Sequence, residues 1–168
     1  MEILDCLKKT VDSGQKTAIL GIGSILRSDD GAGMYFIDLL CEKLRMELCS
    51  GIAQKDNLLL IAGSSAPENF TGVIKDFAPD RLIMIDAAHL GLLPGETQMV
   101  QACDISGVSF STHMLPLSVM LRYLESEAGC EVTFIGIQPE CTDQGLEMCG
   151  QVKEGTEKLA EACCDILK

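Results

Sequence analysis

The chain has 168 residues, a length typical of one folded domain, and we expect residues 1–168 to form a single domain. Hydrophobic residues make up 47% and charged residues 23%, which is typical of a soluble globular protein and excludes a mainly disordered one. A formal net charge of −12 disfavours nucleic-acid binding, because an acidic surface repels phosphate. No apolar run is long enough to cross a membrane, and residues 1–5 carry two acids where a secretory signal has basic residues. We therefore expect a soluble, cytoplasmic monomer.

The nine cysteines form an odd set without a Cys-x-x-Cys pair, which argues against a zinc ribbon and against a disulfide framework. Cys41 and Cys163 lie at helical spacing among leucines, where a cysteine behaves as a small hydrophobic residue. We expect the cysteines to be reduced.

Apolar periodicity predicts strands alternating with helices along the whole chain. The predicted helices cover residues 3–11, 31 to about 47, 116 to about 125 and 152–166, and the predicted strands cover residues 18–22, 57–62, 82–85, 97–101 and 132–137. Short apolar strands alternating with helices indicate an α/β fold with a mostly parallel sheet of about five strands, covered on both faces. In such folds the functional site lies at the carboxyl ends of the strands.

A glycine-bearing loop follows the first predicted strand and spans residues 21–33. It is not a dinucleotide fingerprint, because Leu26 stands where the third glycine is needed, and it lacks the Gly-Lys-Ser/Thr of a P-loop. The loop brings two adjacent carboxylates, Asp29 and Asp30, to the start of a helix. One aspartate is enough to cap the helix, and we expect Asp29 to act mainly as a helix cap or loop former.

Asp86 follows the strand at residues 82–85, and one of the two histidines, His113, precedes a predicted helix. The plain alternatives are a turn-forming role for Asp86 and a solvated position for His113, as for His89 in the loop after Asp86. If Asp30, Asp86 and His113 converge, two oxygen donors and one imidazole leave coordination positions open. Such a set suits zinc, nickel or non-haem iron.

Other catalytic signatures are missing, since the chain has no His-Glu-x-x-His and no Gly-x-Ser-x-Gly. A cysteine nucleophile paired with His113 remains open, because such partners are distant in sequence. No single cysteine is favoured for that role.

Five short motifs, in order over about residues 17–140, resemble those of the hydrogenase maturation endopeptidases. The pieces at residues 65–69 and 136–139 look most like the branch that serves hydrogenase-3-type enzymes. The motifs are Gly21-Ile22-Gly23-Ser24 through Asp29-Asp30-Gly31-Ala32-Gly33, Ser65-Ala66-Pro67-Glu68-Asn69, Ile85-Asp86-Ala87 with Leu93-Pro94-Gly95-Glu96, Ser111-Thr112-His113 with Leu117, and Phe134-Ile135-Gly136-Ile137-Gln138-Pro139.

The resemblance implies a three-layer α/β/α sandwich with a twisted, mostly parallel sheet. It also implies an endopeptidase that removes a C-terminal extension from the large-subunit precursor of a nickel–iron hydrogenase after nickel insertion, recognising the substrate's nickel. The family's three metal-contacting residues correspond to Asp30, Asp86 and His113. Because the nickel arrives with the substrate, the isolated site is expected to be empty or to hold another divalent metal.

Two positions depart from the family pattern. Ser24 stands where the family usually has Asn, and Ala62 stands where it often has an Asp linked to substrate handling. Residues 141–168 carry no motif and are predicted to form a packing helix.

With no serine or cysteine elbow, the hydrolytic water must be activated by a metal or by a carboxylate, either Asp29 or one oxygen of Asp86. Two other functions remain open at this point. One is a stand-alone metal-dependent hydrolase with its own zinc, and the other is a non-enzymatic maturation factor that binds nickel or the precursor.

Overall fold

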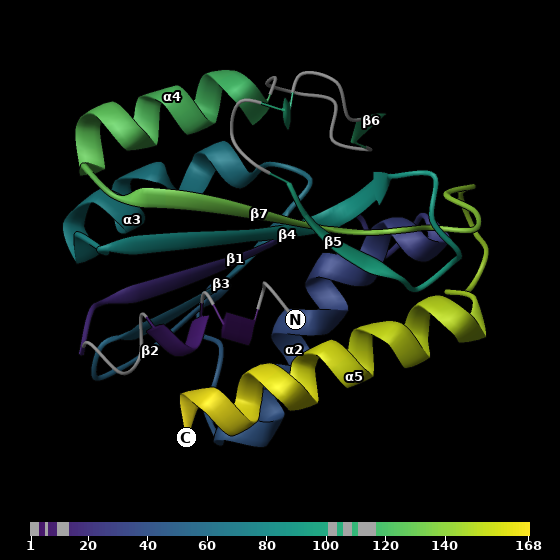
Figure 1. Cartoon of the computed structure of the whole chain (residues 1–168), viewed down its shortest axis with the longest axis horizontal. Coiled ribbons are helices and arrows are strands. Elements are labelled where there is room, and N and C mark those ends of the chain that lie inside the picture. The colour runs from purple at the N-terminus through teal and green to yellow at the C-terminus, as the bar shows by residue number, and fades with distance from the viewer. Residues whose placement is uncertain (1–3, 6, 10–13, 101–103, 106–108, 111–116) are drawn as a thin grey trace.

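The computed structural model describes residues 4–5, 7–9, 14–100, 104–105, 109–110 and 117–168. Six strands form one sheet in the order β2-β3-β1-β4-β7-β5, and a short strand, β6, pairs with β4 outside this order (Figure 1). The four central strands β3, β1, β4 and β7 are parallel, and β2, β5 and β6 are antiparallel to their neighbours. The strands are β1 (Thr17–Ile22), β2 (Ile52–Lys55), β3 (Leu58–Ser64), β4 (Arg81–His89), β5 (Thr97–Val100), β6 (Ser109–Phe110) and β7 (Glu131–Ile137).

Helices cover both faces of this sheet, which confirms the three-layer α/β/α arrangement (Figure 1). One face carries α2 (Ala32–Leu44) and α5 (Gly150–Leu167), and the other carries α3 (Thr71–Phe77) and α4 (Leu117–Ala128). Two short 3-10 helices, η1 (Ser28–Gly31) and η2 (Pro67–Phe70), precede α2 and α3. Residues 4–5 and 7–9 are helical, as far as the predicted N-terminal helix is described.

The two faces of the sheet bury two separate apolar clusters, because successive strand residues point to opposite sides. Ile19 of β1 belongs to the cluster that includes Phe36 of α2. Its neighbour Leu20 belongs to the other cluster, with Ile74 of α3 and Leu121 of α4. The continuous apolar sequence of the central strands follows from this burial on both faces.

Two strands, β2 and β6, and one α-helix, α3, were not predicted from the sequence. Each is short, with four, two and seven residues, so apolar periodicity has little length in which to register. The prediction was also wrong about the end of β4, which continues past Asp86 to His89. The added residues are held by pairing with β7 and β6. Over the described residues, no helix is long and apolar enough to cross a membrane.

Candidate active site

The candidate residues lie at the carboxyl edge of the sheet, where β1 and β4 run side by side. Gly21 of β1 pairs with Ile85 of β4, so the turn after Ile22 lies next to Asp86. The 3-10 helix η1, which carries Asp29 and Asp30, contacts β4. The parallel register therefore brings the two predicted carboxylate positions to one place.

Gly23 forms the tight turn between them, with a φ of +125° that side-chain-bearing residues rarely adopt. A Cβ placed there would collide with the backbone carbonyl oxygen of Asp30 and would lie 3.5 Å from Oδ1 of Asp86. The main chain of Asp30 and the carboxylate of Asp86 thus surround this glycine. Any side chain at this position would occupy the space between them.

Gly33 lets α2 begin directly on the sheet. A Cβ there would collide with the carbonyl oxygens of Ile85 and Ile22, so only a glycine allows this approach. The close contact holds η1, one turn earlier, against the ends of β1 and β4. The glycines of the opening loop therefore position its aspartates.

Asp30 is buried, with 3% of its surface exposed. Its two carboxylate oxygens differ in their hydrogen bonds. Oδ2 accepts a hydrogen bond from the Ser24 amide at 2.9 Å. Oδ1 is buried and accepts no hydrogen bond from the part of the chain that the structure describes. Because an unpaired buried carboxylate oxygen is costly, this atom is a candidate ligand for a cation. The Ser24 hydroxyl accepts a bond from the Leu26 amide at 3.3 Å, so it supports the turn locally.

Asp86 is fully buried within β4, between the buried residues Ile85 and Ala87. Its Oδ1 accepts a hydrogen bond from the Ala87 amide at 2.8 Å. The alternative of a turn-forming role is therefore wrong, because the strand continues through this residue. A carboxylate inside a buried strand violates ordinary strand composition, which points to a functional role.

Asp29 has a structural role, and its oxygens are occupied. Oδ2 accepts bonds from the amides of Glu140 at 2.8 Å and Cys141 at 3.0 Å, and Oδ1 accepts one from Cys149 at 2.7 Å. Cys149 is the N-cap residue of α5, so Asp29 fixes both the loop after β7 and the start of the last helix. Three backbone amides therefore engage this fully buried carboxylate, which holds the segment 140–149 against the opening loop.

The segment 140–149 carries no sequence motif, yet it packs against the opening loop. Ser28 donates from its hydroxyl to the carbonyl of Glu147 at 2.8 Å, and the Gly145 amide donates to the carbonyl of Leu26 at 2.9 Å. This role was missed by the sequence analysis, which assigned everything after residue 140 to helix packing. Its partners are backbone groups, and these leave no signal in side-chain identity.

Gln138, at the end of the fifth motif, organises the loop that follows β4. Its Oε1 accepts hydrogen bonds from the amides of Leu90 at 2.7 Å and Leu92 at 3.3 Å, and its Nε2 donates to the carbonyl of Pro139 at 2.9 Å. The side chain is buried, so these bonds replace water. Its place in a motif was the available signal.

Cys149 contacts Asp29 through its backbone amide, so its thiol is a candidate for the cysteine nucleophile. Burial raises the pKa of its thiol, and a hydrogen bond with the Glu140 side chain and the charge of Asp29 add to this. A raised pKa disfavours the nucleophilic thiolate, so Cys149 does not fit the cysteine–histidine alternative. The seven cysteines within the described ranges are free thiols.

Of the three predicted site residues, Asp30 and Asp86 are brought together around Gly23, and His113 lies outside the described residues. The other histidine, His89, is exposed at the end of β4. Within the described part of the chain, no group of three His, Cys, Asp or Glu residues is arranged to hold a metal. The described chain therefore supplies a pair of buried carboxylates.

Comparison with known proteins assigns the chain to a family. Residues 43–166 match the family model for the hydrogenase maturation protease HycI. The hydrogenase 3 maturation protease of Escherichia coli K12 is 36% identical, over 84% of each chain.

Solved structures agree with the sequence comparison. The crystal structure of a [NiFe] hydrogenase maturation protease HycI from Thermococcus kodakarensis matches with a TM-score of 0.82 at 30% identity, over 96% of this chain and 98% of that one. The solution structure of an endopeptidase HycI from E. coli matches with a TM-score of 0.71 at 31% identity, over 87% of each chain. The chain therefore belongs to the hydrogenase maturation protease family and is a hydrolase of the endopeptidase type.

Proposed function

We propose that this protein removes the C-terminal extension of a nickel–iron hydrogenase large-subunit precursor after nickel insertion. In this proposal Asp30, Asp86 and His113 contact the nickel that the substrate carries. Membership of the hydrogenase maturation proteases supports the activity. The proposal also treats residues 1–168 as one domain, located in the cytoplasm. The single domain is supported by a buried cluster that includes both Leu7 and Cys163, near the two ends of the described chain.

The observation that carries the site assignment is the Oδ1 atom of Asp30. It is a buried carboxylate oxygen without a hydrogen-bond donor from the described residues. The carboxylate of Asp86 lies across Gly23 from the Asp30 backbone. A divalent cation presented by the substrate would satisfy the oxygen that the protein leaves without a donor.

The donor chemistry fits nickel. Two carboxylates and one imidazole occupy part of a coordination shell and leave other positions for ligands from the substrate. A protein that holds the metal only in part depends on the substrate for the rest. Recognition would then require a precursor that has already received its nickel.

Peptide hydrolysis also requires a group to accept a proton from the attacking water and return it to the leaving amine. The carboxylate of Asp29 is already engaged by three backbone amides. Among the described residues, the buried carboxylates of Asp30 and Asp86 are the candidates for this role. The nickel would polarise the scissile carbonyl or acidify the water.

The test is an intact-mass measurement of the cognate large-subunit precursor after incubation with this protein. Nickel-loaded and nickel-free precursors are compared, with His113→Ala as a site variant. We expect loss of a C-terminal peptide only from the loaded precursor and only with the unmodified protease. Full processing by His113→Ala, or equal cleavage of the nickel-free precursor, would contradict the proposed site.

A further inference from the structure

Three large apolar side chains are exposed at the carboxyl edge of the sheet. Ile25 is 71% exposed, Leu26 is 67% exposed and Leu146 is 56% exposed. Single exposed apolar residues are common on protein surfaces, but a group of them bordered by polar residues is typical of a binding surface.

The three residues belong to two segments that the fold ties together. The Gly145 amide donates a hydrogen bond to the carbonyl of Leu26 at 2.9 Å, so Leu146 follows directly on a residue bonded to the opening loop. Ile25 lies against η1, since a Cβ at Gly31 would be 3.6 Å from its Cγ2. Ile25, Leu26 and Leu146 are called the apolar patch below.

Residues next to the apolar patch along the chain are hydrogen-bonded to the aspartates of the opening loop. The amide of Ser24, the residue before Ile25, donates to the carboxylate of Asp30. Asp29 holds the other segment through the amides of Cys141 and Cys149. The same two aspartates thus position the site and the patch, and a substrate bound at the site would lie beside the patch.

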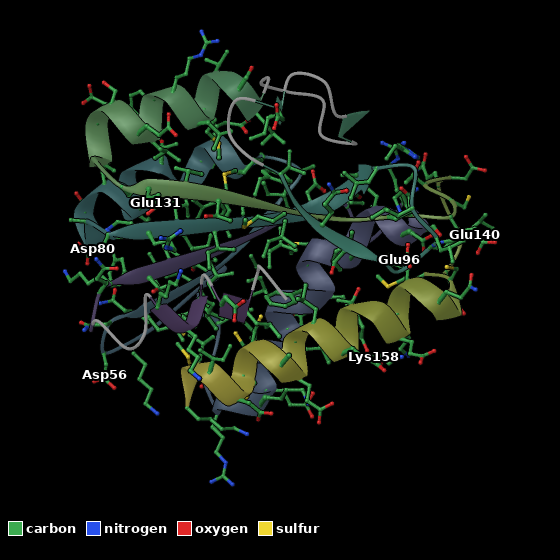
Figure 2. All side chains as sticks on the ribbon, in the orientation of Figure 1. Asp56, Asp80, Glu96, Glu131, Glu140 and Lys158 are labelled. Atoms are coloured by element: carbon green, nitrogen blue, oxygen red, sulfur yellow. The ribbon has the colours of Figure 1, made fainter. Side chains whose placement is uncertain are left out.

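Acidic residues accompany the apolar patch on the segment 140–149. Glu140, Asp143 and Glu147 are all exposed. Glu140 lies at the end of the molecule opposite Asp80 and Glu131, where the carboxyl edge of the sheet is found (Figure 2). A partner that covers the leucines would therefore meet negative charge next to apolar surface.

We propose that the apolar patch is the docking surface for the hydrogenase precursor, and that it receives an apolar segment flanked by lysine or arginine side chains. This inference rests on the proposed function and specifies how its substrate is held. A second copy of the chain is a poorer fit, because a symmetric contact would place the acidic residues of both copies against one another.

The test measures steady-state cleavage of the nickel-loaded precursor together with its Kd for the protease. In Leu26→Ser/Leu146→Ser we expect KM and Kd to rise about tenfold while kcat falls less than about twofold, because apolar burial on docking is lost away from the reacting atoms. The matched control is Val119→Ser, which removes a side chain that is 51% exposed on α4 and should leave both constants unchanged. Thermal unfolding of each variant checks that the fold is intact.

The acidic residues are tested by reversing one charge. Glu147→Lys should weaken binding about threefold and reduce its dependence on salt, because an attraction becomes a repulsion. Glu161→Lys makes the same change in charge at an exposed position of α5 and should have no effect. An unchanged Kd in Glu147→Lys would overturn the basic character assigned to the partner.

The outcomes separate this inference from the proposed function. If the parent protein cleaves and Leu26→Ser/Leu146→Ser binds as tightly as the parent, the docking surface is wrong and the function stands. If the parent binds without cleaving and the variant loses binding, the docking surface stands and the function fails. If the parent is a dimer that the substitutions separate, the patch joins copies of the chain. If the parent neither binds nor cleaves the precursor, both are overturned.

Discussion

Charged groups at the two ends of β4 differ in how their charges are compensated. At the amino end, Arg81 forms an ion pair with Glu131 at 2.6 Å and donates to Thr133, and Asp80 accepts a bond from the Lys16 amide at 2.7 Å. At the carboxyl end, Oδ1 of Asp30 is buried and accepts no bond from the described residues. Figure 2 places Asp80 and Glu131 at one end of the molecule and Glu140 at the other.

The difference indicates which end serves stability and which serves function. Two buried polar atoms at the amino end belong to the same class, the Thr17 hydroxyl and Nε of Arg81. The hydroxyl is neutral, and the charge of the Arg81 guanidinium is balanced by Glu131. An unpaired hydroxyl costs about 1–3 kcal/mol, whereas an unpaired buried carboxylate costs considerably more. A protein retains such a carboxylate where a ligand completes its interactions.

The largest effect on precursor cleavage is expected from Asp30→Asn. The amide keeps the acceptor for Ser24 but removes the charge, so we expect precursor cleavage to fall about 1,000-fold or more. The melting temperature should be unchanged or higher, because an uncompensated buried charge is removed. Intact-mass kinetics and thermal unfolding measure the two effects. Near-parental cleavage would show that this carboxylate is not needed at the site.

Replacing Asp29, the residue next to Asp30, should instead lower the stability of the fold. Asp29→Ala leaves three backbone amides without their acceptor, and we expect the free energy of unfolding to fall by about 3 kcal/mol. Urea unfolding measures the loss, with Asp30→Asn as the matched control. A loss below about 1 kcal/mol would mean that the segment 140–149 is held by other contacts.

The core contributes its own pH dependence of stability, which is measured at high pH and does not involve either end of β4. Burial raises the pKa of Cys163 from 9.0 to about 12, and the neighbouring Cys164 adds to this. Between these values the folded state binds more protons than the unfolded state, so the free energy of unfolding falls as the pH rises, by up to about 1.4 kcal/mol per pH unit. Cys163→Ala should flatten this slope in urea-unfolding measurements. An unchanged slope would assign it to other groups.

The smallest effect belongs to the ion pair at the amino end. Glu131→Gln should lower the free energy of unfolding by less than about 1 kcal/mol, because the Glu131 side chain is 68% exposed. Precursor cleavage should not change, since this end lies away from the site. A clear loss of cleavage would contradict the assignment of stability to the amino end of β4 and of function to its carboxyl end.

The sequence predicted most of the sheet because the central strands are buried on both faces and therefore uniformly apolar. The five predicted strands are present, and α2, α4 and α5 were predicted with small differences at their ends. Residue Asp86 misled the prediction, because a carboxylate normally marks the end of a strand. Here it lies inside one, at the kind of position where function overrides local preference.

The candidate site was predictable in part. Asp30 and Asp86 were selected because residues at the carboxyl ends of adjacent parallel strands meet, and the structure brings them together around Gly23. A structural role for Asp29 was predicted, but its partners were not, because they are backbone amides 111 to 120 residues later in the chain. The assignment of His113 stays a prediction.

The proposed site requires that the carboxylates of Asp30 and Asp86 contact the substrate's nickel. X-ray absorption at the nickel edge tests it most directly, on the loaded precursor alone and in complex with this protein, using a precursor altered at the cleaved bond so that the complex persists. We expect nickel to gain oxygen or nitrogen neighbours when the precursor binds the parent protein, and to gain fewer when it binds Asp30→Asn. A nickel environment that stays the same in the parent complex would contradict it.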